Sequence, residues 1–184
     1  ESIRITYFGG IVDVDCVPLT RAVQKGWLSG LVGDEGVNDV NAPFKIKDLG
    51  IKVETVKSAE SVDYNELIEV CTVTGDGDQR SVRGSLLGRG NDPRIVEVDG
   101  QAIEVRPVDT LLVVRNVDKP GIVGKLGTML GDCAVNIANM SLSRADEGKW
   151  ALTIFELDEE PPETALLAIE QDPDIQEARV SRQS

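Results

Sequence analysis

Histidine is entirely absent from this 184-residue chain. Its absence excludes Ser-His and Cys-His nucleophile pairs as well as histidine metal sites, and it removes the commonest general base of enzymes. Lysine or carboxylate chemistry stays open in principle. The sequence also lacks a GxGxxG segment and a Walker loop, the usual marks of a nucleotide-binding strand-turn-helix. We therefore expect no catalytic residue, no metal site and no cofactor in this chain.

Cysteines are few, and long apolar runs are missing. Cys16, Cys71 and Cys133 are odd in number and form no CxxC pair, which is typical of buried, reduced thiols in a cytoplasmic protein. No apolar run approaches the eighteen or so residues of a membrane-spanning helix, and no charged-then-apolar leader opens the chain. The sequence therefore predicts a soluble, cytoplasmic protein.

Positive charge is also scarce, with 19 lysines and arginines against 32 acidic residues and a net charge of -13. This balance argues against a nucleic acid or an anionic membrane as partner. One segment, residues 80–106, has a net positive charge instead, because it contains five arginines and four acidic residues. Arginine binds phosphate bidentately, so this segment is a candidate anion site. The competing interpretation is a solvated face of alternating charge.

The first hundred residues predict a mixed domain with a largely antiparallel sheet. Asn41 is the expected cap of the second helix, and Asp99-Gly100 is a strong hairpin signal between two short strands. We expect helices at 18–32 and 41–49, and strands at 3–7, 51–56, 67–74, 81–87, 95–98 and 102–105.

The remaining residues predict the order βαββαβ. The expected elements are strands at 110–117, 134–143, 150–157 and 175–181, and helices at 121–131 and 163–170. An acidic run at 156–163 suits a solvated helix start. Residues 106–109 form a short joint, which suits two domains that touch, 1–107 and 108–184. The predicted fold class is α+β.

Two motifs in the second domain carry the strongest functional signal. Asp118-Lys119-Pro120-Gly121 follows an apolar strand, and Val135-Asn136-Ile137 opens the next one. Asp118 is placed to cap the helix, and Pro120 fits its first turn. We expect this unit to bring the helix N–H groups, Asp118 and Asn136 to one place, which suits the carboxylate and ammonium of a zwitterion.

These residues resemble a known family. The blocks at 116–131 and 135–140 are similar to the ACT domain of D-3-phosphoglycerate dehydrogenases. The segments at 15–20, 40–43, 57–64 and 93–100 resemble the intervening domain of the long form of that family. The resemblance covers essentially the whole chain. It implies a mixed α/β intervening domain followed by a ferredoxin-like ACT domain.

The resemblance also implies two sites. In the ACT domain, L-serine would be held by Asn116, Asp118 and Asn136, with the N–H groups of Gly121 and Ile122 facing its carboxylate. The competing interpretation is a plain helix cap at Asp118 and a turn asparagine at Asn136. In the intervening domain, the resemblance implies binding of a phosphorylated substrate or other anions. The arginines expected there are Arg83, Arg94 and Arg106.

By the same resemblance, this chain would be the regulatory part of an NAD-dependent oxidoreductase of L-serine biosynthesis. It would sense serine and assemble a homo-oligomer through the ACT domain, because pairing removes exposed strand edges. NAD and the catalytic histidine–glutamate pair would lie on sequence absent here. The chain also begins within a strand pattern and without methionine, so we expect a C-terminal part of a longer protein.

Two alternatives stay open. One is the beta part of an iron–sulfur L-serine dehydratase, although that family's Ser-Ser-His-Thr type of motif has no counterpart in this histidine-free chain. The other is a free-standing amino-acid sensor.

Overall fold

The computed structural model describes residues 1–108, 110–145 and 148–182. Its contacts divide the chain into two compact units, Glu1–Gly100 (unit 1) and Gln101–Ser184 (unit 2). Each unit combines helices with a sheet, which confirms the predicted α+β class. Asp109, the last residue of the predicted joint, lies outside the described residues, and the predicted domain boundary after residue 107 stays a prediction.

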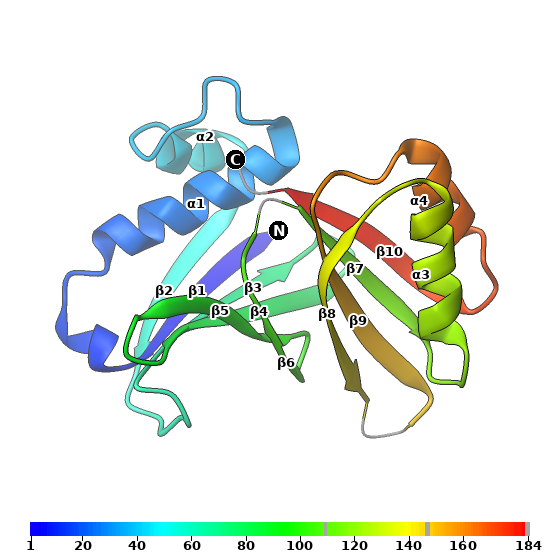
Figure 1. Ribbon diagram of the computed structural model, residues 1–184. Helices are drawn as coiled ribbons and strands as arrows, with labels where there is room; N and C mark the ends of the chain where they lie inside the picture. Colours follow the sequence, from blue (N-terminus) through cyan, green and yellow to red (C-terminus); the bar gives the residue numbers. More distant parts are fainter. Residues whose placement is uncertain (109, 146–147, 183–184) are drawn as a thin grey trace. The chain divides into compact units, whose positions relative to one another are not determined.

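Unit 1 contains a sheet and two helices (Figure 1). Its first strand, β1, pairs parallel with β2 and antiparallel with β3. The sheet has the order β2-β1-β3-β4-β5-β6, with β6 counted in unit 2. The elements are β1 (Ser2–Gly9), the 3-10 helix η1 (Gly10–Asp13), α1 (Val17–Val32), α2 (Ala42–Asp48), β2 (Lys52–Ser58), β3 (Glu66–Val73), β4 (Gln79–Leu87) and β5 (Asp92–Val98).

The alternating directions of the side chains along β1 explain how the helices pack on the sheet. Ile3, Ile5 and Tyr7 lie on one face of the strand and are fully buried. They share a core with Leu28 of α1 and Ile46 of α2, so both helices cover this face. The core therefore fixes the helices over β1 and β2.

Unit 2 has the ferredoxin-like arrangement that the sequence predicted. Its four-stranded antiparallel sheet has the order β10-β7-β9-β8, and α3 and α4 share a core with it. Leu112, Leu126, Phe155 and Ile169 are buried in this core. The elements are β6 (Gln101–Val105), β7 (Thr110–Val117), α3 (Ile122–Asp132), β8 (Ile137–Arg144), β9 (Trp150–Leu157), α4 (Glu163–Glu170) and β10 (Ile175–Arg182).

Several smaller predictions can be compared with the structure. Asp99 and Gly100 have φ values of 49° and 78°, the positive values that a tight hairpin turn requires. All three cysteines are free; Cys16 and Cys71 are buried, whereas Cys133 is half-buried. Among the described residues, no helix is both long and apolar enough to span a bilayer.

Candidate functional site

The start of α3 differs from the predicted cap. The N-cap residue is Gly121, with a φ of 91°, and no side chain accepts a hydrogen bond there. The prediction that Asp118 caps the helix was wrong, because the chain makes a left-handed turn at Gly121 before the helix begins at Ile122. Asp118 instead forms an ion pair with Arg144, with 3.2 Å between Oδ2 and Nε. The first turn of α3 therefore offers N–H groups that no side chain covers.

Asn116 lies inside the sheet and is fully buried. Its Oδ1 accepts a hydrogen bond from the Thr153 hydroxyl at 2.8 Å, and its Nδ2 donates to the carbonyl of Val117 at 3.0 Å. Both polar ends of the side chain thus have partners within the unit. This arrangement ties β7 to β9.

Asn136 lies at the exposed start of β8, beside the end of β9. Its Nδ2 donates to Oδ2 of Asp158, and the backbone N–H of Asp158 donates to the carbonyl of Asn136 at 3.2 Å. The side-chain amide is therefore oriented by a carboxylate at the sheet edge.

The strand register separates Asp118 from Asn136. Val117, next to Asp118, pairs with Trp150 at one end of β9, whereas Ile137, next to Asn136, pairs with Leu157 at the other end. Trp150 and Leu157 are seven positions apart on β9, or roughly 23 Å at the usual strand rise of about 3.3 Å. The expectation that a single βαβ unit brings both side chains together was wrong. The reason is that α3 leads the chain back along the sheet, so β8 starts at the end where β7 began.

An ionic cluster that sequence reasoning missed holds the loop before α3. Lys119 Nζ lies 2.6 Å from Oδ1 of Asp174, and Lys125 contacts both Asp172 and Asp174. The hydrogen bond from Lys125 lowers the pKa of Asp172, and the one from Lys119 lowers the pKa of Asp174. The Asp-Pro-Asp sequence at 172–174 was the available signal. The cluster ties the Asp118–Gly121 loop to the turn before β10.

Arg83, on β4, is enclosed by acidic neighbours. Its Nε donates to Glu69 at 2.8 Å and its Nη1 to Glu97 at 3.2 Å, while the guanidinium lies 5.9 Å from the ring centroid of Phe8. Burial alone would lower the pKa of Arg83, but the hydrogen bond and charge of Glu69, together with Glu97, raise it. Two carboxylates therefore already balance the charge of Arg83.

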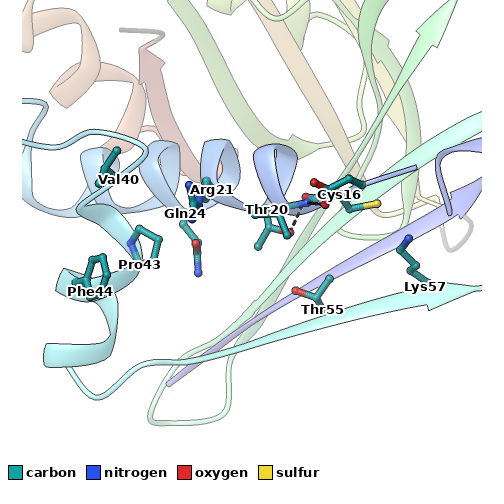
Figure 2. A pocket seen from close by; sticks show the side chains of 11 residues that line it. Cys16, Thr20, Arg21, Gln24, Val40, Pro43, Phe44, Thr55 and Lys57 are labelled. Atoms are coloured by element: carbon teal, nitrogen blue, oxygen red, sulfur yellow. Dashed lines mark hydrogen bonds between the residues drawn. The ribbon is translucent and has the colours of Figure 1, made fainter. Parts of the chain in front are cut away.

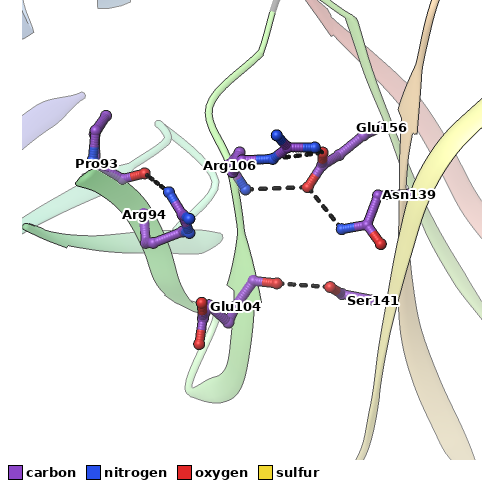
Figure 3. A network of polar contacts seen from close by, with 7 residues as sticks. All are labelled: Pro93, Arg94, Glu104, Arg106, Asn139, Ser141 and Glu156. Atoms are coloured by element: carbon purple, nitrogen blue, oxygen red, sulfur yellow. Dashed lines mark hydrogen bonds and ion pairs between the residues drawn. The ribbon is translucent and has the colours of Figure 1, made fainter. Parts of the chain in front are cut away.

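Arg106 belongs to a network of polar contacts in unit 2 (Figure 3). Its Nε and Nη2 donate to Oε2 of Glu156 at 3.1 and 2.8 Å, and its backbone N–H donates to Oε1 at 3.2 Å. Asn139 Nδ2 donates to the same Oε1 at 3.0 Å. The prediction that the acidic run at 156–163 is solvated is thus wrong at Glu156, whose side chain is 2% exposed because it lies on the buried strand β9.

Arg94, the third predicted arginine, lies on β5. Its Nη1 donates to the carbonyl of Pro93 at 2.8 Å (Figure 3). All three arginines therefore have acceptors within the protein, and the anion site stays a prediction. In the described ranges, no group of three or more acidic or cysteine side chains is placed to hold a metal ion.

Known protein families match each of the two units. Residues 1–99 match the D-3-phosphoglycerate dehydrogenase intervening domain, and residues 110–174 match the ACT domain. The chain is 31% identical to D-3-phosphoglycerate dehydrogenase of Mycobacterium tuberculosis over 168 residues, 91% of this chain and 32% of that protein. The same enzyme of Methanocaldococcus jannaschii is 30% identical over 178 residues, 97% of this chain and 33% of that protein.

The enzyme of that name from Synechocystis is 38% identical over 152 residues, 83% of this chain and 27% of that protein. The chain thus spans about a third of the length of the curated relatives it matches. With an intervening domain followed by an ACT domain, this chain belongs to the D-3-phosphoglycerate dehydrogenase family.

Proposed function

We propose that this chain is the regulatory part of an NAD-dependent D-3-phosphoglycerate dehydrogenase and that unit 2 binds L-serine as an effector. The family match and the names of the relatives support this proposal over the two alternatives. NAD binding and oxidation of 3-phosphoglycerate belong, in this proposal, to sequence other than this chain.

The observation that carries the serine proposal is the placement of Asp118 and Asn136 at opposite ends of one sheet. A single chain cannot offer both side chains to a ligand as small as serine. A two-fold pairing of chains places the Asp118 end of one copy at the Asn136 end of the other, and it does so twice. We infer a homo-oligomer with two equivalent serine sites for each pair of chains.

Each group has a role in such a site. The Asp118 carboxylate attracts the ammonium of serine, and the N–H groups at the start of α3, which no side chain caps, bind its carboxylate. The amide of Asn136 from the second chain fixes the orientation of the ligand. Arg144, now paired with Asp118, is 72% exposed, so the ion pair is weak and its displacement costs little.

A mixed-chain experiment tests this composite site. Chains carrying Asp118→Asn and chains carrying Asn136→Ala are prepared separately, and L-serine binding is measured by calorimetry on each and on their mixture after subunit exchange. Each variant alone has one defect in every site. A mixed pair has one site with both defects and one intact site, so the mixture should recover serine binding.

Recovery in the mixture, with D-serine as a weak-binding control, supports a site built from two chains. If both variants lose serine binding and the mixture shows no recovery although exchange is verified by mass labelling, the two residues act within one chain. Wild-type affinity in both variants would remove Asp118 and Asn136 from the site.

The proposal also includes a phosphorylated substrate or another anion as a ligand of the arginine segment. The net positive charge of residues 80–106 and the 53% exposure of the Arg106 side chain support it. An anion at Arg106 must compete with Glu156, and this competition makes the site testable.

A further inference from the structure

Unit 1 has a cavity of about 430 Å³ between α1, α2 and β2 (Figure 2). This volume lies in the range of small-molecule sites. Residues of α1 form one wall, residues at the start of α2 form a second, and β2 forms the third. The lining residues are Asp15, Cys16, Val17, Thr20, Arg21, Gln24, Val40, Pro43, Phe44, Thr55 and Lys57.

Gln24 is the most informative of the lining residues. It is 8% exposed, and its side chain extends from α1 toward the cavity (Figure 2). Its amide makes no hydrogen bond to any described part of the chain, whereas the neighbouring Thr20 hydroxyl donates to the carbonyl of Cys16 and also bonds the hydroxyl of Tyr7. The amide lies at the surface of the cavity, where it can bond to water or to a ligand in the cavity.

The charges at the cavity favour an anionic partner. Arg21 has no carboxylate partner among the described residues. Lys57 donates to the carbonyls of Val12 and Val14 at 2.6 and 2.9 Å, which leaves one ammonium N–H for another acceptor. The single carboxylate, Asp15, accepts from the N–H of Val17. Two cations against one acid make this cavity net positive in a chain of -13.

The lining also includes apolar side chains that are open to solvent. Val17, Val40 and Phe44 are 54%, 69% and 67% exposed and line the same cavity, and exposed apolar side chains grouped in this way are typical of binding sites. We propose that this cavity binds a small carboxylate with an apolar body. The carboxylate is held by the Arg21 guanidinium and the Gln24 amide, and the apolar body lies against Val40 and Phe44.

Hexanoate is a suitable probe, with hexan-1-ol and hexylammonium as ligands of matched length. Each is titrated into the full 184-residue chain while the ¹H–¹⁵N signals are followed, including the side-chain amide of Gln24. Hexanoate should shift the Gln24 amide and the backbone signals of Val40 and Phe44. Hexan-1-ol should bind more weakly, and hexylammonium should cause no shift at these positions.

Three variants decide the outcome. Arg21→Gln should weaken hexanoate binding by about tenfold, the scale of one lost charge-assisted hydrogen bond. Arg89→Gln removes the same charge outside the cavity and should leave the affinity unchanged. Gln24→Met keeps the side-chain volume but removes the amide, so it should lose the preference for hexanoate over hexan-1-ol.

Equal affinity for hexanoate and hexan-1-ol in the wild type would overturn the proposal, as would equal weakening by Arg21→Gln and Arg89→Gln. The absence of any shift at Gln24 would overturn it too. These results concern unit 1 alone and are independent of serine binding in unit 2.

Discussion

Glu156 and Arg106 form an ion pair in which the acid is buried and the base is half-exposed. The side chain of Glu156 is 2% exposed and that of Arg106 is 53% exposed. The carboxylate accepts three hydrogen bonds from Arg106 and one from Asn139. One acid therefore anchors the segment after β6 and the edge strand β8 to β9.

This network should make the stability of the protein sensitive to acid. Burial raises the pKa of the Glu156 carboxyl, but the hydrogen bonds from Asn139 and Arg106 outweigh it and hold the pKa below the ordinary 4.5. A carboxyl with a lowered pKa in the folded state stabilises the protein above its unfolded-state pKa. This stabilisation is lost as the pH falls through the folded-state pKa.

Glu156→Gln should therefore lower the free energy of unfolding by about 1–3 kcal/mol at neutral pH, the cost of disturbing hydrogen bonds to a buried charged group. It should also flatten the decline of stability below about pH 4.5. Urea denaturation across this pH range measures both effects. Glu159→Gln, which removes an exposed acid three residues further on, is the control, and an equal effect of the two variants would contradict a special role of Glu156.

The same pair gives a prediction for anion binding. If Arg106 is an anion ligand, Glu156→Gln releases its guanidinium from a competing carboxylate and should strengthen sulfate or phosphate binding several-fold. Arg106→Ala should weaken it, and Lys52→Ala, which removes a positive charge outside residues 80–106, should leave it unchanged. Isothermal titration separates affinity from the stability loss expected for Glu156→Gln. Unchanged sulfate affinity in both the Glu156 and Arg106 variants would place the anion site elsewhere or exclude it.

Asn116 provides a prediction that separates a structural role from ligand binding. Thr153→Val removes the hydroxyl that donates to the buried Asn116 Oδ1. An unpaired buried acceptor should lower the free energy of unfolding by about 1–3 kcal/mol. Thr128→Val removes a hydroxyl that bonds only the Gly124 carbonyl of its own helix at an exposed position, so its effect should be much smaller.

If the role of Asn116 is structural, Thr153→Val should leave L-serine affinity, measured on folded protein by calorimetry, at the wild-type value. A loss of serine affinity without a loss of stability would instead show that Asn116 acts on the ligand.

Most of the fold could be predicted from periodicity. Three predicted elements agree with the structure at both ends, namely 110–117 with β7, 150–157 with β9 and 163–170 with α4. In each segment, alternating apolar residues or an apolar helical stripe extends over the whole length. The start of β8 was placed three residues too early. Ala134 has a φ of 59° and the Val135 N–H bonds to the carbonyl of Leu130, so these residues still form the turn that ends α3.

The candidate site was less predictable, because residue identities do not specify partners that are distant in the sequence. Asp118 and Asn136 were visible as polar residues beside a helix start and a strand start. Their separation depends on the register of β8 against β9, which sequence spacing does not contain. Likewise, Glu156 looked like part of an acidic run, and only the pairing of β9 with Leu111 of β7 shows why it is buried.

Two adjacent glycines at the end of β1 allow a sharp test of backbone geometry. Gly9 has a φ of 71° and a ψ of -149°, a region that essentially only glycine adopts. A Cβ at this position would lie 2.1 Å from the carbonyl oxygen of Asn65, too close for any side chain. Gly10 donates its N–H to that oxygen at 2.9 Å, and a Cβ on Gly10 would have its nearest neighbour at 3.6 Å.

Gly9→Ala should therefore destabilise the protein by at least about 1–3 kcal/mol, the usual cost of such a backbone conformation, with the clash in addition. Gly10→Ala should stay within about 1 kcal/mol of the wild type, since its space is open and the unfolded chain loses some freedom. Urea denaturation of both variants measures the difference. The Gly10 N–H holds the Asn65 carbonyl in place, so relief of the clash must break that hydrogen bond. Equal stability of the Gly9→Ala and Gly10→Ala variants would therefore contradict the backbone path described for the end of β1.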